Sequence, residues 1–174
     1  PEHGAVLAML EDDLHAMAVR LRHAAGQVLA VEPVMARAPW NTCPGALAQL
    51  QQTFTGKPLA EVTARQEKRQ NCTHLHDLAV LAAAHASDAE ATRFDLAASD
   101  PVDGQRSLEI RRNGETVWHW VERDEVLVAP AGVAGMTLLT LRDWIGGLSG
   151  AEQEAARLLQ WGGLVAHGRT LPPE

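Results

Sequence analysis

The chain contains no tyrosine, two phenylalanines and only two cysteines among its 174 residues. Because two cysteines cannot build the disulfide framework of a small secreted protein, we expect a reducing, cytoplasmic environment. No apolar run approaches the roughly 20 residues of a membrane-spanning helix, so we expect no membrane insertion. The formal net charge of −7 argues against a general attraction to nucleic acid, so we expect no nucleic-acid partner.

Several catalytic signatures are also missing from the sequence. There is no G-x-S-x-G element, no Walker A loop, no glycine fingerprint of dinucleotide-binding folds and no H-E-x-x-H pair. A hydrolase, an NTPase and a dehydrogenase therefore have no positive support. What the chain does have is 46% apolar residues, which suits a globular protein long enough to bury a substantial core.

The first regular pattern is an alternation of apolar and polar side chains over residues 13–23, which predicts a half-buried strand. Gly26 tolerates a positive φ and predicts a turn into a partner strand over residues 27–35. Pro33 has no N–H for a ladder, which favours an edge strand or a bulge. The side chains expected on the buried faces are His15, Met17, Val19 and Leu21 in the first strand and Leu29, Val31 and Met35 in the second. The lone histidine in this set is more typical of a hydrogen-bonded structural residue than of a ligand.

Two helices are predicted after this hairpin. Pro44 suits a first helical turn and Gly56 suits a C-terminal stop, which places one helix between them. The polar stretch over residues 61–69 is typical of a loop or a short helix. Apolar side chains at helical spacing predict the second helix over residues 73–86. The side chains expected to face the core are Leu47, Leu50 and Phe54 in the first helix and Leu75, Leu78, Ala79 and Ala82 in the second.

The second half of the chain has a different pattern, with short strands and later helices. Asn113-Gly114 is a strong hairpin signal between two of these strands. The expected strands cover residues 91–97, 107–112, 115–121 and 125–129, and the expected helices cover residues 137–145 and 149–163. We therefore predict an α+β fold. Residues 1–88 would form a small antiparallel sheet with helices on one face, and residues 89–174 a β-hairpin with helices, packed together as one compact domain.

The two cysteines occupy matched positions, each directly before an apolar helical run. Cys43 precedes the first predicted helix and Cys72 precedes the second. Unpaired N–H groups and the positive end of the helix dipole favour a thiolate there, the form that attacks electrophiles and binds metals. If the two sulfurs converge, they form a candidate catalytic site. The alternative is that both are small buried apolar side chains, which is a common fate of cysteine.

Two histidines follow Cys72 closely enough to complete a metal site. His76 lies one helical turn later, on the same helix face, and His74 is the reserve candidate. Thiolates and imidazoles suit zinc or iron, so Cys43, Cys72, His76 and His74 are the candidate metal ligands. We expect His76 to be exposed, so that His76→Ala would remove a ligand without unfolding the helix.

Arg37 and Trp40 are candidates for binding a small molecule. Arg37 ends the second predicted strand, six residues before Cys43, where it could stabilise a thiolate or bind a substrate carboxylate through two hydrogen bonds. Trp40 could line an aromatic pocket, with Trp118 and Trp120 as further candidates. The alternatives are an ordinary surface ion pair for Arg37 and core or cross-strand packing for the tryptophans.

Residues 14–86 run strand, glycine turn, strand, Cys43, helix, Gly56-Lys57-Pro58-Leu59, spacer, Cys72 and helix. This layout resembles the scaffold proteins of iron–sulfur cluster assembly, of the IscU, SufU and NifU N-terminal type. In that family a hairpin leads to a cysteine that opens a helix, and a Gly-Lys-x-Leu stretch closes it. The family's site uses three cysteines and an acidic residue. Cys43 and Cys72 match the first and the last cysteine, and the middle one has no counterpart here.

The whole chain also resembles a bacterial family of uncharacterised proteins. The resemblance lies in an Arg-x-Pro-aromatic-x-x-Cys element at residues 37–43 and a Cys-Thr-His-Leu element at residues 72–75. Three functions remain open: a thiol or metal site that handles sulfur, metal or redox chemistry; a small lyase or isomerase acting on a carboxylate-bearing aromatic or acyl substrate; and a structural or partner-binding module. The expected partner is a small molecule or a metal, and a homodimer is one expected assembly.

Overall fold

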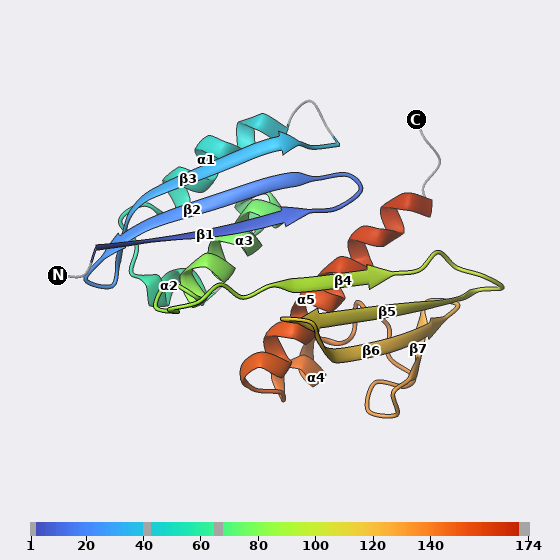
Figure 1. Cartoon of the computed structure of the whole chain (residues 1–174). Coiled ribbons are helices and arrows are strands. Elements are labelled where there is room, and N and C mark those ends of the chain that lie inside the picture. Colours follow the sequence, from blue (N-terminus) through green and yellow to red (C-terminus); the bar gives the residue numbers. More distant parts are fainter. Residues whose placement is uncertain (1–2, 40–42, 65–67, 171–174) are drawn as a thin grey trace. The chain divides into compact units, whose positions relative to one another are not determined.

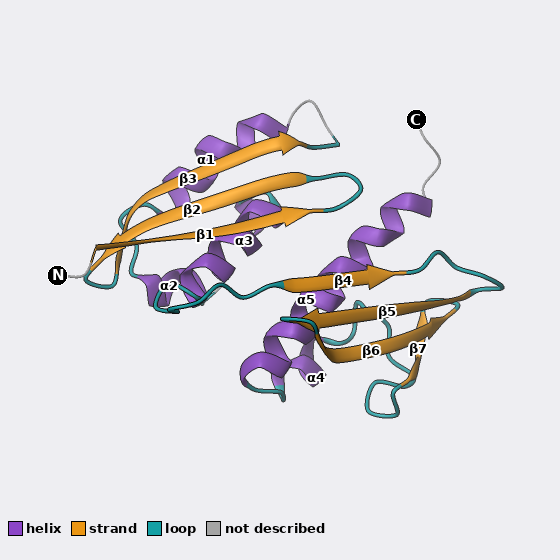
Figure 2. Ribbon diagram, in the orientation of Figure 1, coloured by secondary structure: helices purple, strands orange, loops and turns teal. Residues whose placement is uncertain are grey.

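The computed structural model describes residues 3–39, 43–64 and 68–170. The chain divides into two compact units, Pro1–Ala89 and Glu90–Glu174. Each unit contains one antiparallel sheet and its own helices (Figures 1 and 2). This composition confirms the predicted α+β class. Among the described helices, none is long and apolar enough to cross a membrane.

The sheet of the first unit has three strands in the order β1-β2-β3. They are β1 (His3–Glu11), β2 (Ala16–Ala24) and β3 (Gln27–Arg37). The predicted hairpin is β2–β3, and its turn places Ala25 and Gly26 at φ 48° and 76°, in the left-handed region that glycine tolerates best. β1 has no counterpart among the predicted strands, because its apolar run does not alternate with polar residues.

A bulge in the β2–β3 hairpin explains one wrong prediction. The ladder shifts register between Arg22 and His23, so Leu29 is an extra residue on β3. The bulge turns Val28 into the core and leaves Leu29 53% exposed, whereas simple alternation placed Leu29 inside. Pro33 lies on β3, which is an edge strand of the described sheet, as predicted.

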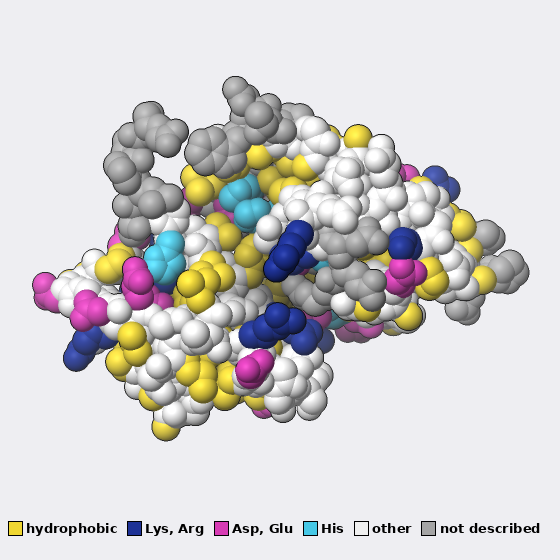
Figure 3. All heavy atoms as spheres, turned by 180° about the vertical axis from the view of Figure 1, so that it is seen from behind, with side chains coloured by type: hydrophobic (Ala, Val, Ile, Leu, Met, Phe, Trp, Pro, Cys, Tyr) yellow, Lys and Arg dark blue, Asp and Glu magenta, His cyan; other side chains and the backbone are white. Residues whose placement is uncertain are grey.

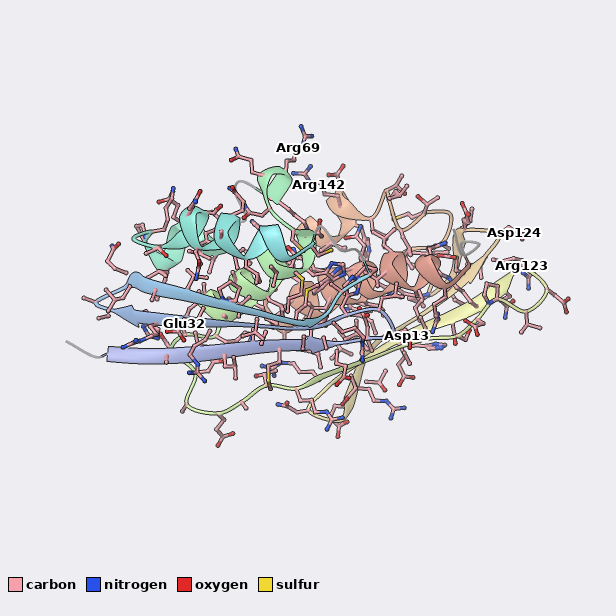
Figure 4. All side chains as sticks on the ribbon, turned by 90° about the horizontal axis from the view of Figure 1, so that it is seen from above. Asp13, Glu32, Arg69, Arg123, Asp124 and Arg142 are labelled. Carbon is pink, nitrogen blue, oxygen red and sulfur yellow. The ribbon has the colours of Figure 1, made fainter. Side chains whose placement is uncertain are left out.

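Two helices cover one face of this sheet, and Figure 4 shows both on the same side of the strands. α1 (Ala46–Phe54) packs against β3, and α3 (Thr73–Ala84) packs against β1 and β2. The shorter elements are α2 (Leu59–Thr63) and the 3-10 turns η1 (Cys43–Gly45) and η2 (Lys68–Gln70). The core between sheet and helices includes Val19, Leu21, Val28, Val31, Leu50, Phe54, Val62, Leu75 and Leu78. Most of these are the side chains that the sequence predicts to be buried.

The second unit has a four-stranded sheet in the order β4-β5-β6-β7, with one long helix packed against it. The strands are β4 (Phe94–Ala98), β5 (Gln105–Arg112), β6 (Glu115–Arg123) and β7 (Val126–Ala129). The helices are α4 (Arg142–Gly146) and α5 (Gly150–Ala166), followed by the 3-10 turn η3 (His167–Thr170). The predicted Asn113-Gly114 turn joins β5 to β6, with φ of 51° and 90°.

Two helix boundaries of the second unit differ from the predictions. The helix expected over residues 137–145 begins only at Arg142. The residues before it form a turn, in which the Thr137 N–H donates to the Thr140 hydroxyl (2.9 Å) and the Thr140 N–H donates to the Thr137 carbonyl (3.0 Å). α5 continues to Ala166, past Gly162 and Gly163, where the sequence predicts the helix to end. A Cβ on Gly163 would lie 2.9 Å from Leu138, so this glycine serves close packing of the helix and not its termination.

Candidate functional site

The loop that joins β1 to β2 is closed by the side chain of Asp12. Its Oδ1 accepts hydrogen bonds from the backbone N–H groups of Leu14 (2.8 Å) and His15 (2.7 Å), and the Asp12 N–H donates to the His15 carbonyl (3.0 Å). Aspartate often closes turns in this way, because its short side chain reaches N–H groups a few residues later. The neighbouring Asp13 marks this loop in Figure 4.

The same carboxylate orients the His15 ring. The two Asp12 oxygens lie 2.9 and 3.1 Å from His15 Nδ1. The His15 side chain is 7% exposed and that of Asp12 is 28% exposed. When Nδ1 donates its proton to Asp12, Nε2 presents its lone pair to the surroundings. A carboxylate in this position fixes the ring and makes the imidazole a better ligand.

His74, the second residue of α3, completes the group. Its ring stacks on that of His15, with centroids 3.9 Å apart and an angle of 28° between the planes. Asp12, His15 and His74 each offer one ligand atom, and these atoms lie within 4.8 Å of one another. Across the described ranges, no other histidines, cysteines and carboxylates gather as a group of three within that distance. Figure 3 shows histidine side chains at separate points of one face, so surface exposure does not identify the site.

Two of the three groups have shifted pKa values. Burial and the charge of neighbouring His15 lower the pKa of His74 from 6.5 to about 4. Burial acts to raise the pKa of Asp12, but hydrogen bonds from the Leu14 N–H, the His15 ring and the His15 N–H outweigh it, so that pKa lies below its usual 3.8. At neutral pH His74 is therefore uncharged and Asp12 is a carboxylate, which are the forms that bind metals.

The low pKa of His74 predicts a pH-dependent stability. The unfolded chain takes up a proton at His74 near 6.5 and the folded chain only near 4, so the unfolded state binds more protons between these values. The free energy of unfolding should therefore fall as the pH is lowered through this range. Because the side chain is only half-buried, we expect a loss of about 1–2 kcal/mol, less than the full shift would supply.

Urea unfolding at a series of pH values tests this expectation. His74→Gln should remove the His74 part of the pH dependence. His119→Gln, at an exposed position of β6, is the control and should retain it. Wild type and His74→Gln with the same pH dependence would contradict the assignment.

Arg37 ties the end of β3 to the loop that carries Asp12 and His15. Its Nη2 donates to the carbonyl oxygens of Asp12 (2.6 Å) and His15 (3.2 Å) and lies 3.3 Å from the Glu11 carboxylate. The Arg37 and Glu11 side chains are 48% and 76% exposed, so this is the surface ion pair anticipated as the alternative. A catalytic or carboxylate-binding role for Arg37 stays a prediction.

His76 is fully buried, and the expectation that it is exposed is wrong. Its ring lies 5.3 Å from that of Phe54, and its Nδ1 is 3.3 Å from Asp77 Oδ1. Asp77 in turn accepts a hydrogen bond from Lys68 Nζ at 2.6 Å. The spacing rule assumed one buried helix face, but α3 lies against the sheet and against α2, so every residue from 75 to 80 is buried. His76 is therefore a core residue, and its role as a metal ligand stays without support.

Both cysteines stand where helices begin, as the sequence indicates. Cys72 is the N-cap residue of α3, and Cys43 opens η1 directly before α1. Both thiols are free and half-buried, and Cys72 packs against the core of the first unit. Neither belongs to the Asp12–His15–His74 group. A shared catalytic or metal site at Cys43 and Cys72 stays a prediction, and Trp40 lies outside the described residues.

The other candidate tryptophans pack in the second unit. Trp118 and Trp120 on β6 meet Trp144 edge-on, with ring centroids 5.3 and 6.1 Å apart. The Trp118 Nε1 donates to the Glu152 carbonyl at 2.9 Å. These contacts agree with the alternative that Trp118 and Trp120 serve core or cross-strand packing.

Of the assembled group, only His74 is among the candidate ligands predicted from the sequence. The sequence pattern indicates a structural role for His15 and does not mark Asp12. The available signal was the Asp-x-x-His spacing at the start of a predicted strand, which allows the carboxylate to reach both the turn and the ring.

Comparison with known proteins finds a family model that matches part of the chain. Residues 4–87 match a family model described as "Protein of unknown function (DUF2889)". The matched stretch includes Asp12, His15, His74 and both cysteines. Neither the curated proteins nor the solved structures yielded a match. The first unit of this chain is thus similar to an uncharacterised family, DUF2889.

Proposed function

We propose that the first unit is a metal-binding module that holds a divalent cation, zinc or iron(II), through Asp12, His15 and His74. The observation that carries this proposal is the gathering of three ligand atoms within 4.8 Å of one another. Two imidazoles and one carboxylate are a donor set that both zinc and iron(II) accept in proteins. The protein would thus handle a metal or use it in chemistry.

The protonation states support the proposal. A metal competes with protons for each ligand, so groups already deprotonated at neutral pH bind it at a lower cost. The pKa of His74 at about 4 and the lowered pKa of Asp12 meet this condition. For Asp12 and His15 to bind the same ion, the metal would take the place of the proton between the Asp12 carboxylate and His15 Nδ1, because a carboxylate held by Nδ1–H is too far from Nε2 to share a metal there.

Binding requires one movement within the group. A metal lies in the plane of each imidazole that binds it, and stacked rings do not point their lone pairs at a common position. His15 is held by Asp12 and is nearly buried, so His74 is the ring that has to turn. We therefore expect the NMR signals of the His74 ring to shift most when metal is added.

The order of elements around the two cysteines supports a metal- or sulfur-handling role for the same unit. Along the sequence, a strand, a glycine turn, a second strand, Cys43, a helix, Cys72 and a further helix follow one another, and this order is the basis for the resemblance to the iron–sulfur scaffold proteins. Two free, half-buried thiols at helix starts suit that chemistry. The missing middle cysteine is the reason to propose metal binding in general, and not cluster assembly.

Calorimetric titration of untagged, chelator-treated protein with zinc tests the proposal. Wild type should bind one zinc ion, and His74→Ala and Asp12→Asn should each weaken binding by about 10-fold or more. His119→Ala, which removes an exposed histidine of the second unit, is the matched control and should bind like wild type.

Two outcomes would contradict the proposal. One is the absence of zinc binding by wild type. The other is binding that survives His74→Ala and is lost in Cys43→Ser or Cys72→Ser, which would place the metal at the thiols instead.

A further inference from the structure

We propose that the metal at Asp12, His15 and His74 takes a small anion of the carboxylate or phosphate type as a further ligand. This inference rests on the proposed function, because it concerns the coordination positions that the three side chains leave open. Zinc with three protein ligands keeps a fourth position, and iron(II) with two histidines and one carboxylate keeps more than one. In the part of the chain that the structure describes, no fourth ligating side chain joins the group.

The site can be reached from solvent on one side. His15, with 7% of its side chain exposed, forms the inner wall. Asp12 is 28% exposed, and His74 is half-buried. The Nε2 atom of His74 is itself buried, so a ligand reaches the site past Asp12 once the His74 ring turns, a movement that metal binding requires as well.

α3 supplies a positive potential at this place. His74 is the second residue of a 12-residue helix whose N-cap, Cys72, makes no side-chain cap hydrogen bond, and the first turn carries no acidic residue. Exposed N–H groups and the helix dipole favour a negative charge within the first turn. Asp77, one turn later, is neutralised by its 2.6 Å ion pair with Lys68.

Charge balance at the metal favours the same class of ligand. A divalent cation held by one carboxylate and two uncharged imidazoles keeps one net positive charge. Arg37 beside the loop is balanced by Glu11 and does not change this sum. An anion would neutralise the centre, whereas a neutral ligand would leave a charge in a half-buried site.

Cobalt(II) provides the test, because it replaces zinc or iron(II) in such sites and its visible absorption depends on its ligands. Untagged, chelator-treated protein is loaded with cobalt and titrated with azide. We expect a saturable change in the visible spectrum. Competition by acetate in one arm and by inorganic phosphate in the other then identifies the preferred class of anion. A cobalt spectrum that azide leaves unchanged would overturn this inference alone, whereas failure to bind cobalt would overturn the proposed function as well.

A matched pair of variants tests the contribution of α3. Thr73 is exposed at the first position of the helix. Thr73→Asp adds a carboxylate there, and Thr73→Asn adds an uncharged side chain of the same shape. We expect azide to bind about two- to five-fold more weakly to cobalt-loaded Thr73→Asp than to Thr73→Asn, with equal cobalt content. Equal azide affinity in the two variants would overturn the electrostatic argument.

The thiol of Cys72, two positions before His74, is one competitor for the open position. A cobalt–thiolate charge-transfer band that disappears in Cys72→Ser would show that a protein thiolate fills this position, and would overturn the inference. Absence of that band in wild type, together with a response to azide, supports it.

Discussion

Replacing Glu122 by alanine is expected to lower the free energy of unfolding of the second unit by about 3–5 kcal/mol. The Glu122 and Arg106 side chains are 5% and 4% exposed, and the carboxylate accepts two hydrogen bonds from the guanidinium, at 2.9 and 3.3 Å. Arg106 also donates to the Gly163 carbonyl at 3.3 Å and contacts His167 Nε2 at 2.6 Å. Neither of these partners carries a negative charge. Without Glu122 the guanidinium would therefore stay buried and uncompensated.

Urea unfolding followed by tryptophan fluorescence measures this effect, because fully buried Trp120 lies on β6 in the same unit. Arg93→Ala is the control, since it breaks an ion pair with Asp95 in which Arg93 is 80% exposed, and it should cost less than about 1 kcal/mol. Combining Arg106→Met with Glu122→Leu should recover most of the loss, because no buried charge remains. A loss from Glu122→Ala as small as that of the control would show that water reaches the pair.

His76→Ala is expected to lower the free energy of unfolding of the first unit by about 2–4 kcal/mol. The ring is 0% exposed, packs beside Phe54 and contacts the buried Asp77 carboxylate. Its removal leaves a cavity in the core and takes a polar contact from Asp77. This outcome is the opposite of the one expected for an exposed ligand on a helix surface.

Circular dichroism during urea unfolding gives the stability, and zinc titration of the same variant gives its metal affinity. Thr73→Ala, at the exposed first position of α3, should cost much less and serves as the control. If His76→Ala is as stable as Thr73→Ala and also loses zinc, then His76 is a ligand and its structural role is refuted. A destabilised variant that still binds zinc when folded would agree with the site at Asp12, His15 and His74.

Local sequence patterns were enough to predict much of the secondary structure. The β2–β3 hairpin follows from alternation and from a glycine that accepts a positive φ. α1 begins soon after Cys43, as predicted. Gly56, which follows the end of α1, has the positive φ that suits a helix stop. The predictions were wrong where the conformation of a residue depends on contacts with residues far away in the sequence. Leu29 faces outward because of a bulge in the pairing with β2, and Gly163 stays helical because Leu138 and Leu108 lie against it.

For the candidate functional residues too, some properties follow from local sequence and others depend on tertiary contacts. The sequence by itself determined that Cys43 and Cys72 stand at helix starts and that His74 lies in the first turn of α3, because these are relations between neighbours along the chain. Only the tertiary structure decided that His74 stacks on His15, that Asp12 holds both the loop and the ring, and that His76 lies in the core. Burial and cross-chain contact depend on how the sheet and α2 pack around α3. The spacing of apolar residues along one helix indicates which face is buried most. It does not indicate how many sides of that helix are covered by other elements.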